Sequence, residues 1–285
     1  MPVINVRGVE HYYEWIRQPT ASQTKPVIVF IHGWGGSARY WESTALTLSE
    51  QFDCLLYDLR GFGRSKLPQE PIEELLYETE DYAEDLAALL DTLELRRVYI
   101  MAHSMGASSA VLFLNRYPER VERAVLTCSG IFEYDEKSFS AFHKFGKYVV
   151  QFRPRWFLRV PFASAMFMAR FLHRPLPVAL SRAFLEDFLE ADYKAALGTM
   201  LTSVSKYAAE VMPQEFAQLS VPTLLVAGTH DKIIPAELGR RAAQLNEKVE
   251  YFEIPDTAHF PMLEKPDVYL ERVQEFLGVG FPANA

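Results

Sequence analysis

Short, almost continuously apolar segments recur along the chain, separated by stretches in which apolar residues are spaced three or four apart. The apolar segments are residues 26–31, 52–58, 97–102, 123–128, 223–227 and 249–254. Such runs are typical of parallel strands covered on both faces, and the intervening spacing is typical of amphipathic helices. Residues 4–14 alternate instead, as in an antiparallel hairpin at a sheet edge. The pattern therefore predicts an α/β fold with a doubly wound, mostly parallel β-sheet.

The segment from 131 to 217 departs from this rhythm, because it has several aromatic-rich helical stretches and no sheet-like run. We interpret it as a helical cap inserted into a core domain made of residues 1–130 and 218–285. An insertion after a central parallel strand lies over the carboxyl edge of the sheet, where open α/β sheets bind ligands. The cap is therefore expected to shape a substrate pocket.

Residues 98–106 (VYIMAHSMG) run from an apolar strand directly into Ser104, with the small residues Ala102 and Gly106 two positions to either side. Small residues are needed there if the chain reverses sharply from strand to helix, as in the turn that exposes a nucleophilic serine. A serine at this place can equally be a helix N-cap. Taken alone, the segment leaves both interpretations open.

A nucleophilic serine needs a base to accept its proton and an acid to orient that base. Asp231 follows the fifth apolar segment, and His259 follows the sixth. Because the carboxyl ends of parallel strands share one edge, we expect both side chains to lie beside Ser104. Glu133, which follows the fourth segment, is the competing acid, and we prefer Asp231.

The other histidines are less suited to the role of base. His103 is expected to point away from the side chain of Ser104. A structural or pocket-lining role is expected for His230, and His11, His143 and His173 do not lie at the end of a core strand.

Acyl transfer also needs two donors for the developing oxyanion. We expect one to be the backbone N–H of Met105 and the other that of Trp34, in the loop H-G-W-G-G at residues 32–36. A glycine-rich loop can instead hold a phosphate, but no Lys-Ser/Thr follows here, as a P-loop requires. Trp34, Phe132 and Phe260 are the residues we expect to contact the substrate.

Three further motifs give the chain a resemblance to the α/β-hydrolase superfamily, in which the triad follows the same order of Ser, Asp and His. They are H-G-x-G-G-S at 32–37 with Trp41, D-x-R-G-x-G-x-S at 58–65, and H-F-P-x-L-E-x-P at 259–266. The resemblance extends from about Val27 to Leu277. Ala102 and Ala258 stand where the family usually has glycine, and neither change removes a reacting group. Relatives that cleave epoxides or haloalkanes carry an aspartate nucleophile, so Ser104 argues against those reactions.

The amino-acid composition of the chain limits the kinds of molecule and the location that we expect for it. The 285 residues carry a net charge of −8, which argues against non-specific nucleic-acid binding. The N-terminal residues do not resemble a secretory signal and no apolar run is long enough to span a bilayer, so a cytoplasmic location is expected. Cys54 and Cys128 are expected to be buried and reduced, and no metal or cofactor is expected.

The predicted cap differs in charge from the rest of the chain. Residues 137–185 contain nine Lys or Arg and no Asp or Glu, together with many aromatic residues. A surface that is both basic and aromatic is typical of peripheral membrane contact. The alternative is that the aromatic residues form the core of the cap and the cations face water.

The sequence thus predicts a serine hydrolase that cleaves a carboxylic ester with a lipophilic acyl or alcohol part through an acyl-Ser104 intermediate. The same triad also serves thioester or carbon–carbon bond hydrolysis, perhydrolysis and small-molecule lyase reactions. The second class of function is a ligand-binding receptor on the same fold.

Overall fold

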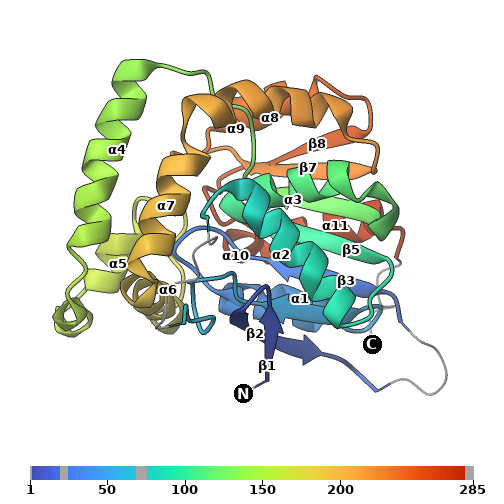
Figure 1. The fold of residues 1–285 in the computed structure, drawn as a ribbon, viewed down its shortest axis with the longest axis horizontal. Helices are drawn as coiled ribbons and strands as arrows, with labels where there is room; N and C mark the ends of the chain where they lie inside the picture. The colour runs from blue at the N-terminus through green and yellow to red at the C-terminus, as the bar shows by residue number, and fades with distance from the viewer. Residues whose placement is uncertain (1, 20–24, 69–75, 280–285) are drawn as a thin grey trace.

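The described part of the computed structural model, residues 2–19, 25–68 and 76–279, contains an eight-stranded sheet in the order β1-β2-β4-β3-β5-β6-β7-β8 (Figure 1). The strands are β1 (Val3–Val6), β2 (Val9–Ile16), β3 (Val27–Ile31), β4 (Asp53–Tyr57), β5 (Val98–His103), β6 (Val121–Thr127), β7 (Thr223–Gly228) and β8 (Val249–Ile254). β1 and β2 form an antiparallel hairpin. In the series β4-β3-β5-β6-β7-β8, each strand pairs in parallel with the next. The predicted α/β fold with a mostly parallel sheet is confirmed.

Side chains on both faces of the central strands are buried. In β3, Val29 and Ile31 belong to one apolar cluster with α2 (Thr79–Thr92) and α3 (Met105–Arg116). Ile28 and Phe30 belong to a second cluster with α1 (Glu42–Leu48) and α11 (Pro266–Leu277). This burial on both faces is the reason that the strands are continuously apolar in sequence. The helices that flank the sheet are α1 (Glu42–Leu48), α2 (Thr79–Thr92), α3 (Met105–Arg116), α8 (Lys206–Gln218), α9 (Ala236–Ala243) and α11 (Pro266–Leu277).

A group of helices between β6 and β7 lies to one side of the sheet (Figure 1). It consists of α4 (Glu136–Gln151), the short 3₁₀ helix η3 (Arg155–Arg159), α5 (Ala163–Met168), α6 (Val178–Glu190) and α7 (Tyr193–Ser203). The predicted cap extends to residue 217, but α8 packs against α3 and α9 in the layer that flanks the sheet. The helices set apart from the sheet therefore end before α8. Within the described segments, none of the helices is both long and apolar enough to cross a bilayer.

Candidate active site

Ser104 occupies a sharp turn between β5 and α3. Its φ of 53° and ψ of −123° are rare for a residue other than glycine. Gly106 allows α3 to pack closely on β3, since a Cβ there would lie 2.3 Å from the carbonyl oxygen of His32. The side chain of Ser104 makes no capping hydrogen bond to α3. The turn thus has the strained geometry expected of an exposed nucleophile, and the side chain has no N-capping role.

The side chains of Ser104, His259 and Asp231 form a hydrogen-bonded row at the carboxyl ends of β5, β8 and β7. The Nε2 atom of His259 lies 3.1 Å from Ser104 Oγ, and its Nδ1 atom lies 2.7 Å from Asp231 Oδ2. The other carboxylate oxygen of Asp231 accepts the backbone N–H groups of Ile233 and Ile234 at 2.7 and 3.0 Å. Because a carboxylate can only accept, His259 donates from Nδ1, which leaves Nε2 able to accept the serine proton.

The chain after β6 turns away from Ser104. The backbone N–H of Ile131 donates to the carbonyl of Leu238 in α9, and Glu133 forms an ion pair with Arg241 at 2.7 Å. Glu133 therefore does not reach His259, and Phe132 does not line the cavity beside Ser104. Phe132, which we expected to contact the substrate, is not among the residues that line this cavity, because its segment follows α9 and not the edge of the sheet.

Two backbone amides beside Ser104 are free to donate. Within the described residues, the N–H groups of Trp34 and Met105 have no hydrogen-bond acceptor. The neighbouring Gly33 N–H donates to the hydroxyl of Tyr40, and a Cβ at Gly33 would lie 3.0 Å from Ser104 Cβ. The indole N–H of Trp34 donates to the carbonyl oxygen of Ala196 in α7, with 2.9 Å between the nitrogen and the oxygen. This hydrogen bond holds the ring against that helix. The glycine-rich loop is thus held against the turn at Ser104.

The buried His103 connects the three loops of the site, a role that the sequence analysis missed. Its Nε2 atom lies 2.8 Å from the backbone carbonyl oxygen of His259, and its Nδ1 atom lies 2.9 Å from the hydroxyl of Tyr40. Burial lowers the pKa of His103 well below its usual value, so the ring is neutral. A carbonyl oxygen only accepts, so Nε2 carries the proton and Nδ1 accepts from Tyr40.

A cavity of about 90 Å³ adjoins Ser104 and His259. Its wall is mostly apolar and comes largely from the helices between β6 and β7. The apolar side chains that line it are Trp34, Phe167, Met168, Phe171, Phe184, Phe188, Ile233 and Phe260. Trp34 and Phe260 were expected to contact the substrate, and both lie in this wall; Phe184 and Phe188 of α6 were not singled out from the sequence.

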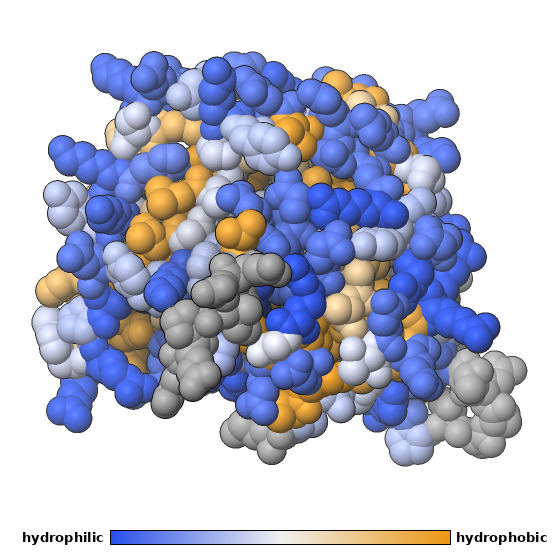
Figure 2. All heavy atoms as spheres, viewed as in Figure 1, coloured by the Kyte–Doolittle hydropathy of each residue, from blue (hydrophilic) through white to orange (hydrophobic). Residues whose placement is uncertain are grey.

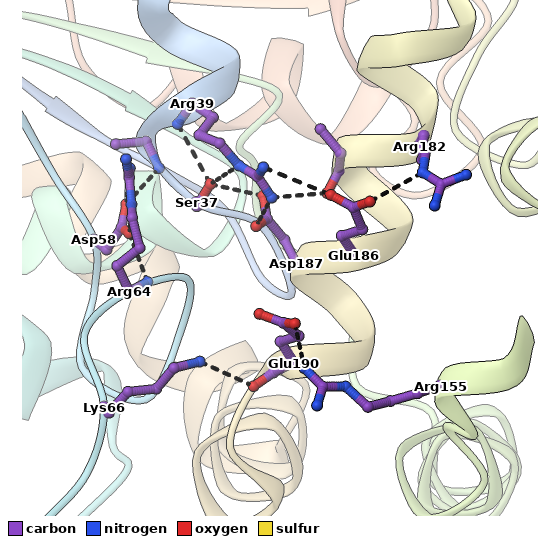
Figure 3. A network of polar contacts seen from close by, with 12 residues as sticks. Ser37, Arg39, Asp58, Arg64, Lys66, Arg155, Arg182, Glu186, Asp187 and Glu190 are labelled. Carbon is purple, nitrogen blue, oxygen red and sulfur yellow. Dashed lines mark hydrogen bonds and ion pairs between the residues drawn. The ribbon is translucent and has the colours of Figure 1, made fainter. Parts of the chain in front are cut away.

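Helix α6, which supplies Phe184 and Phe188, is tied to the loops of the sheet by a polar network (Figure 3). Ser37 Oγ donates to Asp187 Oδ2 at 2.6 Å, and Arg39 pairs with the other oxygen of Asp187. Burial raises the pKa of Asp187, while these two partners stabilise its charged form. The network fixes one wall of the cavity relative to the glycine-rich loop.

A second connection joins the segment after α5 to the loop that carries His259. The Oε2 atom of the buried Glu264 accepts the backbone N–H groups of His173 and Arg174 at 2.7 and 2.8 Å. Its Oε1 atom accepts the N–H of Ala258 at 2.9 Å. Glu264, part of the last sequence motif, therefore positions this loop and the segment after α5 together.

Two clusters of side chains have metal-ligand chemistry. The buried cluster of His103, Cys128 and His259 has both ring nitrogens of each histidine already engaged in hydrogen bonds. In the exposed cluster, the rings of His173 and His230 stack at 4.0 Å, and Asp256 pairs with Lys265 at 3.1 Å. Cys54 and Cys128 are both buried.

Comparison with known proteins identifies the family to which this fold belongs. The sequence profile of the family described as "alpha/beta hydrolase fold" matches residues 26–266. The uncharacterized hydrolase YugF of Bacillus subtilis is 23% identical over 95% of this chain and 96% of its own length. The enol-lactonase of Burkholderia xenovorans LB400 superimposes with a TM-score of 0.77 and 23% identity, covering 97% of this chain and all of that one. An esterase from Exiguobacterium antarcticum gives a TM-score of 0.78 with 19% identity, covering 97% and 98%.

Proposed function

Since the chain belongs to the alpha/beta hydrolase fold family, we propose that it hydrolyses a carboxylic ester with a short apolar acyl group through an acyl-Ser104 intermediate. The observation that carries this proposal is the row of Ser104, His259 and Asp231 beside two unpaired amides. This is the set of groups that acyl transfer needs: a nucleophile, an oriented base and donors for an oxyanion.

In the first half of the reaction, Ser104 Oγ attacks the ester carbonyl carbon while its proton passes to His259 Nε2. The carbonyl oxygen becomes an oxyanion, which accepts hydrogen bonds from the N–H groups of Trp34 and Met105 in this proposal. The tetrahedral intermediate then collapses, the bond from carbon to the alcohol oxygen breaks, and His259 gives its proton to the departing alcohol. Ser104 is left as an ester of the acyl group.

In the second half, water attacks the acyl-Ser104 carbonyl and His259 accepts the water proton. Collapse of this second intermediate releases the carboxylic acid, and the proton returns from His259 to Ser104 Oγ. Asp231 stays ionised throughout and stabilises the imidazolium that forms in each half. Its second oxygen is occupied by two backbone amides, so the carboxylate cannot rotate away from His259 without losing them.

The cavity supports a short apolar acyl group. Its volume of about 90 Å³ is far below the roughly 300–1,000 Å³ of pockets that enclose drug-sized ligands. The lining contains aromatic side chains and no Asp, Glu, Lys or Arg, which favours an apolar acyl group over a polar one. An acyl group of about two to four carbons therefore suits the space beside Ser104.

The test is hydrolysis of p-nitrophenyl esters with acyl chains from two to sixteen carbons, measured for the wild type and Ser104→Ala. We expect turnover with an optimum at short chains, and a loss of about 10⁴-fold or more in the variant. Treatment with a fluorophosphonate should add one adduct, at Ser104. Undiminished turnover by Ser104→Ala, or labelling at another residue only, would refute the mechanism. Labelling of Ser104 without ester turnover would shift the assignment to a different bond.

A further inference from the structure

The outer surface of α4, η3 and the start of α5 concentrates exposed aromatic side chains. Among the described residues, every exposed Phe or Trp lies between positions 142 and 162, and they are Phe142, Phe145, Phe152, Trp156 and Phe162. Phe152 and Phe162 expose 74% and 80% of their surface. Figure 2 shows one face of the molecule, on which apolar residues reach the surface among hydrophilic ones on the side of α4. Isolated exposed apolar residues are ordinary, but such a cluster marks an interaction surface.

The aromatic side chains of α4 are not needed for its packing. The helix turns Phe139, Gly146 and Val150 inward. Gly146 brings it close to α7, since a Cβ there would lie 2.2 Å from the sulfur of Met200. The outward aromatic positions follow at intervals of three, three and four residues, which places them along one side of the helix. They are Phe142, Phe145, Tyr148 and Phe152.

The same surface is positively charged. Four of its cations form no ion pair anywhere in the described segments, namely Lys137, Lys144, Lys147 and Arg159. Residues 137–185 hold nine of the 29 basic residues and none of the 37 acidic ones, so the rest of the chain is strongly acidic. This asymmetry orients the molecule in an electric field, with these helices toward negative charge.

We propose that this surface, which we call the basic aromatic surface, binds peripherally to a bilayer with anionic lipid headgroups. Aromatic side chains insert at the level of the headgroups, and Lys and Arg beside them bind the negatively charged surface. An anionic bilayer can accommodate the aromatic side chains and bind the cations at the same time. A second copy of this chain would bring the same cations together, and an acidic protein would satisfy the cations but not an extended aromatic surface.

The basic aromatic surface is joined to the cavity by α5. Met166 exposes 72% of its surface, whereas the next two residues, Phe167 and Met168, line the cavity beside Ser104. One turn of helix thus separates the proposed lipid contact from the apolar wall of the site. A lipophilic ester dissolved in the bilayer would have a short path to Ser104.

The experiment is co-sedimentation of the full chain with vesicles of phosphatidylcholine alone and with about 30% phosphatidylglycerol added. We expect binding to the anionic vesicles, at least tenfold weaker binding to the neutral ones, and release at about 0.5 M NaCl, which screens exposed charges. The aromatic variant Phe145→Ser/Phe152→Ser/Trp156→Ser and the charge variant Lys144→Glu/Lys147→Glu should each lose about tenfold or more in partition coefficient. The matched controls Leu46→Ser/Leu245→Ser and Arg96→Glu/Lys248→Glu change exposed residues elsewhere and should bind as the wild type does.

Equal and negligible sedimentation of the wild type with both vesicles would overturn the proposal. So would an equal loss in the variants and their controls, because the effect would then be one of general charge or hydrophobicity. Concentration-dependent dimerisation that the aromatic variant abolishes, without vesicle binding, would assign the surface to contact between copies. Hydrolysis of a soluble short ester by the same variants should stay unchanged, which separates failure of this proposal from failure of the proposed reaction.

Discussion

The imidazole of His103 donates from Nε2 to the backbone carbonyl of His259 at 2.8 Å, so the residue before the candidate nucleophile holds the loop of the candidate base. Its other nitrogen accepts the Tyr40 hydroxyl, which in turn accepts the N–H of Gly33. A single hydrogen-bonded chain thus runs from the glycine-rich loop through the end of β5 to the loop after β8. The relative positions of the oxyanion donors, nucleophile and base depend on it.

Replacing Tyr40 by Phe tests this chain. The substitution leaves the Gly33 N–H and His103 Nδ1 without partners, so we expect the free energy of unfolding to fall by about 1–3 kcal/mol. The kcat for ester hydrolysis should fall about tenfold with little change in KM, because the loops lose their fixed relative positions while every reacting group is still present. Tyr57→Phe is the matched control, since the buried hydroxyl of Tyr57 has no hydrogen-bond partner among the described residues. Equal effects of the two substitutions would show that Tyr40 acts only through packing.

Phe188→Ala should enlarge the cavity beside Ser104. Phe188 lies against Phe167 and Trp34 in the wall, so its loss is expected to move the preferred acyl chain of p-nitrophenyl esters to longer lengths. Stability should fall by about 3 kcal/mol, as for other buried Phe→Ala changes. Leu185→Ala, in the same helix and buried outside the cavity wall, should lower stability without moving the optimum. An unchanged optimum in Phe188→Ala would place the acyl group elsewhere.

Glu264→Gln should loosen the connection between the His259 loop and the segment after α5. The carboxylate accepts backbone N–H groups on both oxygens, whereas one end of an amide side chain can only donate. We expect a loss of about 1.5–3 kcal/mol in unfolding free energy, measured by urea denaturation, and a lower kcat. Glu271→Gln, an exposed change in α11, is the control. A variant as stable as the wild type would contradict the positioning role.

The buried His11 should make stability depend on pH. Burial lowers its pKa from 6.5 to about 4, so below pH 6.5 the unfolded chain binds a proton that the folded chain does not. Stability is therefore lost as the pH falls from about 6.5 toward 4, by about 2–3 kcal/mol at pH 4.5. Burial raises the pKa of the nearby Asp85 to about 6, so protonation of Asp85 favours the folded state as the pH falls and opposes the effect of His11. The contribution of His11 is therefore the difference in unfolding free energy between the wild type and a His11 variant. Urea unfolding of the wild type and His11→Asn should diverge in this sense, and parallel curves would contradict the prediction.

The sheet was predictable because its sequence pattern has a direct physical cause. Strands buried on both faces must be apolar throughout, and the six apolar segments match β3 to β8 to within two residues. The proximity of Asp231 and His259 to Ser104 follows from the same argument, since side chains after parallel strands meet at one edge. Small residues at 102 and 106 marked the turn at Ser104 for a steric reason.

The parts that sequence did not predict depend on where loops and inserted helices pack. Phe132 follows a strand as Asp231 does, but its segment is bonded to α9, which no local pattern encodes. The expectation that His103 would point away from Ser104 missed that its ring contacts the backbone of His259. The sequence pattern also did not say which aromatic residues of 137–185 are buried: Phe139 is buried, Phe167 lies in the cavity wall and Phe152 is exposed.

β6 and β7 are neighbours in the sheet, although α4 to α7 lie between them in sequence. The chain leaves the sheet and returns to it at adjacent strands, and Ser104, Asp231, His259 and the two free amides all lie outside the excursion. The groups that would break a bond and most of the wall that would choose the substrate therefore lie in separate segments of the chain, although Trp34, Ile233 and Phe260 add to that wall from the segments that carry the triad. Recombination can replace the segment between β6 and β7 and leave the segments that carry the triad unchanged. Such a chain can acquire a new substrate while it keeps the same reaction.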